Sequence, residues 1–389
     1  MRIQVQRGND RFGVIHASLR HQTLPPWGKG AAMQPRFLIL GAGIMGAALA
    51  HRLARDGASV TVIEALAPAI GASGRSFGWV NASFFLSEDH FHLRRAAMEA
   101  HRQLAAELAR PYQPEGCLWY EETGVAFDRQ LAALEALDYP LRLLDRAAVA
   151  ALEPRLAHPP ERALFFPLES AQDPGDLTHA LLGSASSHSA HLICGLRVEG
   201  LTQSDDRITG IRTAAGDIHA DHVILCTGTG TPALLAPLGL HLPMLHRPGA
   251  LLVTRPLQPL LHHILATSDQ EVRQDAQGRL IAPASAHHQA DAAEALPPPQ
   301  EMEQATLMRL RHLFPNAFIR PDRLFLAERP VPGDGLPVIG PVLPGLSLAV
   351  MHSGATLAPL VADLLAAELG GQGEQALLAP FRSARFFTG

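Results

Sequence analysis

One arginine near the C-terminal end of the chain stands in a segment that is rich in turn-forming residues. Arg329 belongs to AERPVPGDGLPVIGP, residues 327–341, which carries four prolines and three glycines. Such a segment cannot be a helix, and it indicates tight turns between short extended pieces. A guanidinium fixed there could bind a carboxylate through two hydrogen bonds, or it could form a structural ion pair with Glu328 or Asp334. The residues alone leave both roles open.

A glycine pattern near the start of the chain indicates a nucleotide site. The segment RFLILGAGIMGAALAHRLARDGASVTVIEA places Gly41, Gly43 and Gly46 in the pattern GxGxxG, directly after the apolar residues 37–40. The first glycine permits a tight turn, the second lets backbone approach a pyrophosphate, and the third lets a helix pack closely on a strand. The N-terminus of that helix would face the phosphates with its partial positive charge.

The residues around the glycines follow the order strand, turn, helix, second strand and acid. Glu64 ends the second strand at about the offset, roughly 20 residues, at which an acid binds a ribose hydroxyl pair, and this favours FAD or NAD over NADP. We therefore predict a dinucleotide site in an α/β fold. Its predicted cofactor contacts are Gly41, Ala42, Gly43, Ile44, Met45, Gly46 and Glu64.

Length and composition are those of a folded protein with two domains. The chain has 389 residues, of which 47% are hydrophobic and 18% charged, so a disordered or fibrous protein is excluded. A net charge of -5 argues against a nucleic-acid partner. Cys117, Cys194 and Cys226 are far apart, so we predict neither a disulfide framework nor a metal site, as suits a reducing cytosol.

Residues 1–35 are predicted to be a disordered N-terminal extension. Charged residues interrupt them, so they are not a signal peptide, and Met33 is an alternative start to Met1. No apolar run reaches the roughly 20 residues that cross a bilayer. We expect a cytoplasmic protein without a transmembrane segment, and a peripheral contact with the inner membrane stays open.

The segment that follows the second strand resembles a known flavoprotein family. GASGRSFGWVNASF, residues 71–84, is similar to the pattern GASG.S.G of the D-amino-acid oxidase superfamily, which includes glycine oxidase, sarcosine oxidase and D-amino-acid dehydrogenase. In that family the segment passes under the flavin pyrophosphate and ribityl chain. The resemblance implies FAD as the cofactor, with contacts from Ala72, Ser73, Gly78 and Trp79.

Two later segments resemble the same family. DPGDLTHALLGSA predicts a helix with Asp173 as its N-cap, and it leads to Val198, which matches a position whose backbone meets the adenine. RITGIRTAAGDIHADHVILCTGTG predicts a hairpin and then a strand, residues 207–225. That strand runs into Thr227 and Gly228, which look like the family's turn against the cofactor.

The C-terminal segment GLSLAVMHSGATLAPLVADLLAAEL predicts a strand, a turn at Gly354 and a helix from about Thr356. By resemblance, the helix N-terminus points at the flavin pyrimidine edge, where its dipole would stabilise the negative charge of the reduced flavin. The implied contacts are Gly354, Ala355, Thr356 and Leu357.

The resemblance also implies the domain organisation. We predict a Rossmann-type FAD-binding domain from residues 36–84, 162–236 and 328–389. An interleaved α+β substrate domain, built on an antiparallel sheet, takes residues 85–161 and 237–327. In the substrate domain, EVRQDAQGRLIAP predicts a hairpin around Gln277 and Gly278.

The implied activity is oxidation of the C–N bond of a small amino acid or N-alkyl amino acid, by hydride transfer to flavin N5. In the family, the arginine that matches Arg329 grips the substrate carboxylate. His352 is a second candidate active-site residue, with an ordinary hydrogen-bonded loop histidine as the alternative. Two further functions stay open: oxidation of a 2-hydroxy acid, and a non-catalytic FAD-binding subunit of a larger complex.

The chain also departs from part of the family. Sarcosine-type oxidases use a lysine to activate oxygen and a cysteine to attach flavin, but Lys29 is the only lysine and no cysteine stands near Ala327. We therefore predict non-covalent FAD, with electrons passing to O2, to a quinone or to another carrier. Both departures favour a dehydrogenase over a sarcosine oxidase.

Overall fold

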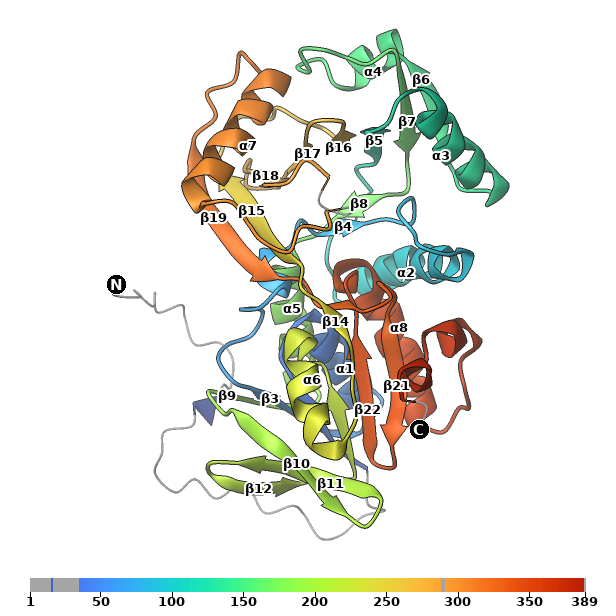
Figure 1. Cartoon of the computed structure of the whole chain (residues 1–389), viewed down its shortest axis with the longest axis vertical. Coiled ribbons are helices and arrows are strands. Elements are labelled where there is room, and N and C mark those ends of the chain that lie inside the picture. Colours follow the sequence, from blue (N-terminus) through green and yellow to red (C-terminus); the bar gives the residue numbers. More distant parts are fainter. Residues whose placement is uncertain (1–14, 17–34, 113, 288–290, 388–389) are drawn as a thin grey trace.

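The computed structural model describes residues 15–16, 35–112, 114–287 and 291–387, and it contains two large β-sheets. A seven-stranded sheet lies in the lower half of Figure 1 and an eight-stranded sheet in the upper half. The chain enters each half more than once, as the predicted interleaved architecture requires. The fold is therefore α/β with a second, substrate-side half.

Five parallel strands form the centre of the seven-stranded sheet, in the order β9, β3, β2, β13, β22. β2 and β13 are apolar along almost their whole length because both faces of the sheet are covered. β1 continues the parallel order at one edge, and β21 pairs antiparallel with β22 at the other. The strands are β1 (Ile15–His16), β2 (Arg36–Leu40), β3 (Ser59–Glu64), β9 (His191–Cys194), β13 (His222–Leu225), β21 (Val338–Leu343) and β22 (Leu346–Val350).

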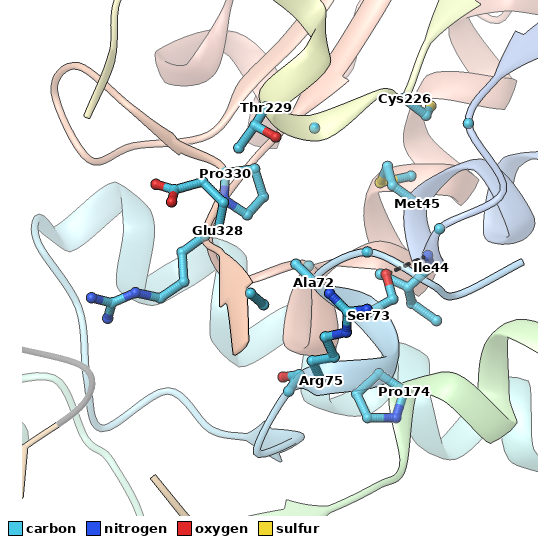
Figure 2. A pocket seen from close by; sticks show the side chains of 18 of the residues that line it. Ile44, Met45, Ala72, Ser73, Arg75, Pro174, Cys226, Thr229, Glu328 and Pro330 are labelled. Carbon is cyan, nitrogen blue, oxygen red and sulfur yellow. Dashed lines mark hydrogen bonds between the residues drawn. The ribbon is translucent and has the colours of Figure 1, made fainter. Parts of the chain in front are cut away.

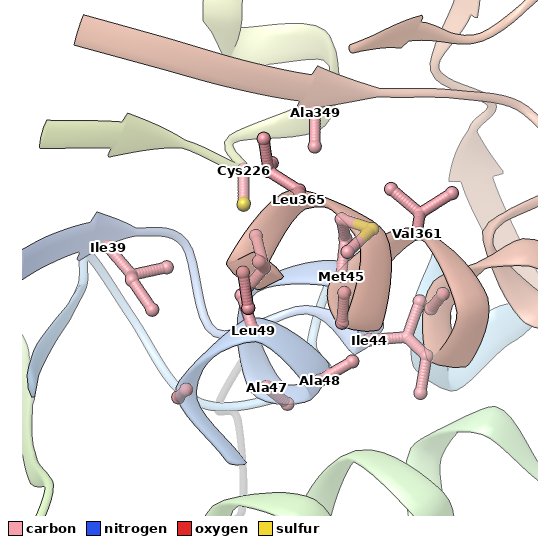
Figure 3. Close-up of a cluster of buried hydrophobic side chains, with 14 of the residues drawn as sticks. Ile39, Ile44, Met45, Ala47, Ala48, Leu49, Cys226, Ala349, Val361 and Leu365 are labelled. Atoms are coloured by element: carbon pink, nitrogen blue, oxygen red, sulfur yellow. The ribbon is translucent and has the colours of Figure 1, made fainter. Parts of the chain in front are cut away.

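Helices cover one face of this sheet. Ile39 of β2 packs in one core with Leu49, Val361 and Leu365 of the helices and with Cys226 (Figure 3). The Asp173 side chain accepts hydrogen bonds from Gly175 and Asp176 at the start of α5, which confirms the predicted cap. The helices are α1 (Ile44–Arg55), α5 (Pro174–Ser187) and α8 (Gly354–Leu369).

A small antiparallel sheet and a short helix cover the other face. Ile211 and Leu235 of these elements pack with Leu38 and Leu225 of the large sheet. The pairing of β11 with β12 confirms the predicted hairpin, and β13 follows it as expected. The elements are β10 (Val198–Ser204), β11 (Arg207–Thr213), β12 (Gly216–His219) and α6 (Thr231–Leu235).

The eight-stranded sheet has the order β19, β15, β18, β17, β16, β5, β7, β6, and every pair except β16 with β5 is antiparallel. β17 and β18 form the predicted hairpin around Gly278. Leu310 of α7 packs against one face, and Phe127 of α3 packs against the other. The elements are β5 (Cys117–Tyr120), α3 (Gly124–Ala136), β6 (Arg142–Asp145), α4 (Arg146–Leu152), β7 (Arg162–Phe166), β15 (Pro248–Thr254), β16 (Ile264–Thr267), β17 (Glu271–Gln274), β18 (Leu280–Pro283), α7 (Pro299–Leu313) and β19 (Pro321–Glu328).

Two short ribbons join the halves where the chain passes between them. β4 pairs with β8, and β14 pairs with β20, both antiparallel. The second ribbon follows directly on β19, which ends at Glu328. The strands are β4 (Trp79–Val80), β8 (Ser170–Ala171), β14 (Met244–Leu245) and β20 (Val331–Pro332).

Two predicted domain assignments are wrong. β7 was placed in the cofactor domain by the boundary at residue 162, but it pairs with β5 and β6 in the eight-stranded sheet. α2 (Glu88–Glu107) was placed in the substrate domain, but its Leu93, Ala97 and Leu104 lie in the same core as α1 and α8. α2 also packs on the substrate half, because its Phe91 and Met98 lie in one core with Trp119 and Phe166 of the eight-stranded sheet, so this helix joins the two halves.

The start of α8 and the extent of the N-terminal extension were also predicted. α8 begins at Gly354, two residues before the predicted start at Thr356. The predicted disorder of residues 1–35 and the choice between Met1 and Met33 lie almost entirely outside the described residues. Within that range the two residues of β1 are not disordered, because they pair with β9.

Candidate active site

A cavity of about 710 Å³ lies between the two halves of the molecule. One wall is formed where β2, β3, β13 and β22 end, with Gly41, Glu64, Cys226 and Met351 among the lining residues. The opposite wall comes from β15 and β19 of the eight-stranded sheet. Ligands of open α/β sheets bind at the carboxyl ends of the parallel strands, and the size suits a cofactor together with a small substrate.

The glycines at the α1 end make room that no other residue would leave. Gly41 has φ +101°, and a Cβ there would lie 2.5 Å from the carbonyl oxygen of Cys226. A Cβ on Gly46 would lie 2.0 Å from the carbonyl oxygen of Gly41, which is too close for any side chain. The turn therefore brings bare backbone to the cavity and seats α1 directly against β2.

Two side chains fix the first backbone amides of this turn. Ser73 Oγ accepts a hydrogen bond of 2.9 Å from the amide of Ile44 at the start of α1, as Figure 2 shows. Glu64 accepts 2.9 Å hydrogen bonds from the amides of Ala42 and Leu66. An acid and a hydroxyl from two different segments thus hold the glycine turn in place at the positive end of α1.

The segment of residues 72–79 crosses the middle of the cavity. Gly78 has φ +78°, and a Cβ there would meet the carbonyl oxygen of Gln172 at 1.8 Å. The carbonyl of Trp79 accepts a hydrogen bond from Thr356 Oγ1 at 3.0 Å, and Trp79 Nε1 donates to Glu169 at 2.8 Å. This segment is therefore fastened to α8 on one side and to the substrate half on the other.

Arg329 lines the far end of the cavity, with its side chain largely buried. Its Nε donates to the carbonyl of Arg247 at 3.0 Å, and its Nη2 donates to the carbonyl of Asp291 at 3.1 Å. The Asp291 carboxylate lies 3.6 Å from the same Nη2. Burial lowers the pKa of Arg329, and the nearby Asp291 carboxylate opposes that shift. The guanidinium is therefore held by backbone and already faces one carboxylate.

Both ion-pair partners suggested for Arg329 by the sequence are wrong. Glu328 pairs with His246 at 3.0 Å and accepts from the amide of Arg247 at 2.7 Å. Asp334 pairs with Arg385 at 2.7 Å. Each of these two carboxylates forms its ion pair with another residue, and the carboxylate paired with Arg329 is that of Asp291.

His352 lines the same end of the cavity and is half-buried. The pKa of His352 is lowered to about 4, chiefly by burial and also by the positive charges of Arg329 and Arg94. The imidazole is therefore neutral at pH 7.

Among the lining residues that the sequence did not identify are Arg94 and Asp291. Arg94 is only 2% exposed and comes from α2. A signal for it was present, because Arg94 lies three residues after the buried Phe91 and four before the buried Met98, on an apolar helix face. Asp291 stands in no apolar pattern of the sequence, so it gave no such signal.

The predicted cofactor contacts divide into two groups. Leu357 is fully buried in the helix core and does not line the cavity, and neither do Ala42 and Gly46, which act through backbone packing. The predicted contacts that do line it are Gly41, Gly43, Ile44, Met45, Glu64, Ala72, Ser73, Gly78, Trp79, Val198, Thr227, Gly228, Gly354, Ala355 and Thr356.

The residues present fit FAD. The glycine turn would hold the pyrophosphate, Glu64 the ribose, and Val198, with Arg197 beside it, lines the cavity near β10 where the adenine would lie. In the part of the chain that the structure describes, no three histidine, cysteine or acidic residues are grouped as metal ligands would be. Also within that part, no helix is long and apolar enough to cross a membrane.

Comparison with known proteins agrees with this reading. A model of the family of FAD dependent oxidoreductases (DAO) matches residues 36–368. Glycine oxidase of Pseudomonas aeruginosa is 25% identical over 363 residues, which cover 87% of this chain and 96% of that protein. D-amino acid dehydrogenase of Rhizorhabdus wittichii is 30% identical over 224 residues, 56% of this chain and about half (53%) of the relative.

A solved structure supports the same likeness. The crystal structure of glycine oxidase from Geobacillus kaustophilus superposes with a TM-score of 0.80 at 25% sequence identity. The match covers 91% of this chain and 100% of that one. The similarity therefore extends over both halves of the molecule.

Proposed function

The chain belongs to the DAO family of FAD-dependent oxidoreductases, and we propose that it oxidises the C–N bond of a small amino acid or N-alkyl amino acid. FAD is its cofactor, and the absence of a cysteine near Ala327 supports non-covalent binding. Bound FAD supplies the acceptor, at its N5 position, for the hydride that leaves the substrate α-carbon.

The observation that carries this proposal is the setting of Arg329. Its guanidinium lines the cavity and is fixed by backbone carbonyls, and the Asp291 carboxylate lies 3.6 Å from it. A carboxylate is therefore compatible with this position, and a substrate carboxylate would gain charge-assisted hydrogen bonds by taking it. The amino group and α-carbon of such a substrate would then lie within the cavity.

The other residues at this end would orient the substrate and handle one proton. Oxidation requires the neutral amine, so the proton of an ammonium group must first be accepted. His352, neutral at pH 7, and Asp291 are the lining groups that can accept it. The apolar lining residues, among them Leu251 and Met351, would exclude water from the reacting carbon.

A 2-hydroxy acid is a second candidate substrate, because Arg329 would bind its carboxylate equally well. Its hydroxyl proton must be removed during oxidation, and neutral His352 in the cavity is the observation that favours this alternative.

The lysine content of the chain bears on the electron acceptor. Lys29 is the only lysine of the chain, and no lysine stands among the described residues that line the cavity to promote reaction with O2. This favours a dehydrogenase that passes electrons to a quinone or another carrier.

Anaerobic reduction of the bound cofactor tests the proposal. The purified protein should show flavin absorbance, and the visible band should bleach on addition of D-amino acids, glycine, sarcosine or proline derivatives. Bleaching by 2-hydroxy acids alone would select the second candidate. Bound flavin that no carboxylate substrate bleaches would leave a non-catalytic FAD-binding subunit. The reduced protein, mixed with O2 or with a soluble quinone, then identifies the acceptor by the faster reoxidation.

A further inference from the structure

Arg94 is a charged side chain buried in the cavity wall with only neutral hydrogen-bond acceptors. It is 2% exposed, and it lines the cavity from α2. Its Nε donates to the carbonyl of Asn81 at 3.1 Å, its Nη2 to Asn81 Oδ1 at 2.5 Å, and its Nη1 to Ser353 Oγ at 2.6 Å. Among the described residues, none forms an ion pair with it.

The position of Arg94 adds to its positive charge. Ser353 is the N-cap residue of α8, a helix of 16 residues, so the guanidinium lies at the positive end of that helix. α2 also holds the first turn of α8 through His101, whose Nε2 lies 2.9 Å from the carbonyl oxygen of Ala355 and 3.0 Å from that of Thr356. Two sources of positive potential are thus fixed at one place in the cavity wall.

The nearest buried acid does not cancel this charge by contact. Glu169 is fully buried, and its carboxylate accepts from Trp79 Nε1, the amide of Ser83 and the hydroxyl of Tyr139. Burial lowers the pKa of Arg94 to about 10, which still leaves it a cation at pH 7. A buried cation without a contacting anion is costly, so the cavity next to it favours negative charge.

The layout of the cavity indicates which part of FAD this charge meets. Pyrophosphate binds at the N-terminus of the first helix after a GxGxxG turn, so the α1 end receives the phosphates. The start of α8 adjoins that turn, since a Cβ on Gly354 would lie 3.3 Å from Ile44 Cγ2. Arg94 lies on the α8 side of this junction, and the ring system would lie against that side. Reduction of FAD by two electrons and one proton gives FADH⁻, in which the ring system carries one negative charge.

We propose that Arg94 supplies the positive charge that stabilises the reduced ring system of FAD and so raises the midpoint potential of the bound cofactor. This role concerns the cofactor alone and holds whichever substrate the enzyme oxidises. Electrostatic stabilisation of this kind acts without rearrangement, because the guanidinium is already held by three hydrogen bonds.

The test is the midpoint potential of the FAD-loaded protein, titrated anaerobically with dithionite against a reference dye. Arg94→Gln removes the charge and should lower the potential by about 30 mV or more, which is a tenfold change for a two-electron couple. Arg94→Lys keeps the charge and should retain most of the wild-type value. Equal shifts in both variants, or no shift in Arg94→Gln, would overturn the proposal.

A second variant covers the case in which Arg94→Gln does not retain FAD. Asn81→Asp keeps the shape of the Arg94 partner and adds a carboxylate that pairs with the guanidinium, so it should also lower the potential. An unchanged potential in Asn81→Asp would contradict the proposal.

Arg273→Gln is the matched control for loss of a buried arginine. Arg273 is 6% exposed and donates to the carbonyl of Phe77, but it does not line the cavity. This variant should lose stability while the potential stays at the wild-type value. A fall in its potential equal to that of Arg94→Gln would show a general effect of destabilisation and refute the role of Arg94. Since dithionite replaces the substrate, failure here is distinct from failure of the proposed activity.

Discussion

The start of α1 and the start of α8 adjoin in the cavity wall, with a Cβ on Gly354 placed 3.3 Å from Ile44 Cγ2, but they are built differently. At the α1 end, the contacts come from a glycine turn within residues 41–46, and a Cβ has no room at Gly41 or Gly46. At the α8 end, the contacts are side chains from distant segments, such as Arg94 and Ser353, which are 259 positions apart in the chain. The first end therefore depends on backbone shape, and the second depends on side-chain identity.

This difference explains how one fold can keep its cofactor and change its substrate. A backbone site tolerates substitution of most neighbouring side chains but no added atom at its glycines. A side-chain site such as that of Arg329 and Asp291 changes its specificity with a single replacement. We therefore expect variants at the two ends to fail differently, the first by losing FAD and the second by losing substrate.

The largest effect should come from Gly46→Ala. The new Cβ would lie 2.0 Å from the carbonyl oxygen of Gly41, so α1 must move away from β2 and the glycine turn must open. We expect a protein that loses its flavin absorbance on gel filtration or does not fold. Gly200→Ala is the control, since a Cβ there meets nothing within 4 Å, and it should retain FAD. Retention of FAD by Gly46→Ala would show that the glycine turn is not rigid.

Arg329→Ala should have the next largest effect. It should weaken the binding of substrate but not the binding of FAD. Loss of charge-assisted hydrogen bonds to a carboxylate costs about 3 kcal/mol, which is roughly a 100-fold weaker Kd. The measurement is the concentration of a bleaching substrate that gives half-maximal anaerobic reduction. Arg329→Lys keeps the charge but not the two-pronged geometry, so it should lie between wild type and Arg329→Ala. Unchanged affinity in Arg329→Ala would refute the carboxylate role, and loss of FAD would show that the two ends are not independent.

The contrast between the backbone contacts of the α1 end and the side-chain contacts of the α8 end also explains which parts of the site could be predicted from the sequence. The α1 end was predictable because its glycines, helix and acid are close in the chain and each has a mechanical reason. Ser73 was identified through its segment, although its bond to the amide of Ile44 was not foreseen. The parallel sheet and both hairpins followed from apolar runs and turn residues.

The α8 end was predictable only in part, because its residues meet through tertiary packing. Arg94 was not assigned to the site because its apolar helix face indicates burial but not that α8 packs against α2 beside it. Glu328 and Asp334 pair with His246 and Arg385 rather than with Arg329, and the local sequence does not reveal these contacts between distant segments. Leu357 does not line the cavity, because this fourth residue of α8 faces the helix core.

Glu64→Ala should weaken FAD binding modestly. Glu64 is the one side chain at the α1 end that holds the Ala42 amide and is also placed for a ribose. Loss of these hydrogen bonds costs about 1.5 kcal/mol, or roughly tenfold in the Kd of FAD measured by flavin fluorescence. Glu199→Ala, an exposed acid on β10, is the control and should bind FAD as wild type does. A Glu64→Ala protein with wild-type affinity would mean that backbone alone makes this end.

The smallest expected effect is that of His352 on the pH dependence of kcat/KM. The pKa of His352 is lowered to about 4 by burial and by Arg329 and Arg94, so His352 stays neutral from pH 5 to 8. The profile of kcat/KM should therefore show no inflection from His352 in that range, and His352→Gln should give a profile parallel to the wild type. An inflection near pH 6.5 that His352→Gln abolishes would contradict the positive potential assigned to this end.

The pH dependence of the free energy of unfolding is an independent measure of the lowered pKa of His352. Between pH 6.5 and 4 an unfolded histidine takes up a proton, whereas folded His352 does not, so the folded state loses stability as pH falls through this window. His352→Gln removes that component, and its free energy of unfolding should fall less between pH 7 and pH 4.5 than that of the wild type. Arg94→Gln should raise the pKa of His352 and also flatten this fall, because one of the two cations that oppose its protonation is gone. Identical pH dependence in all three proteins would mean that His352 does not feel the charges at the α8 end, and that this end resembles the α1 end more than its side chains suggest.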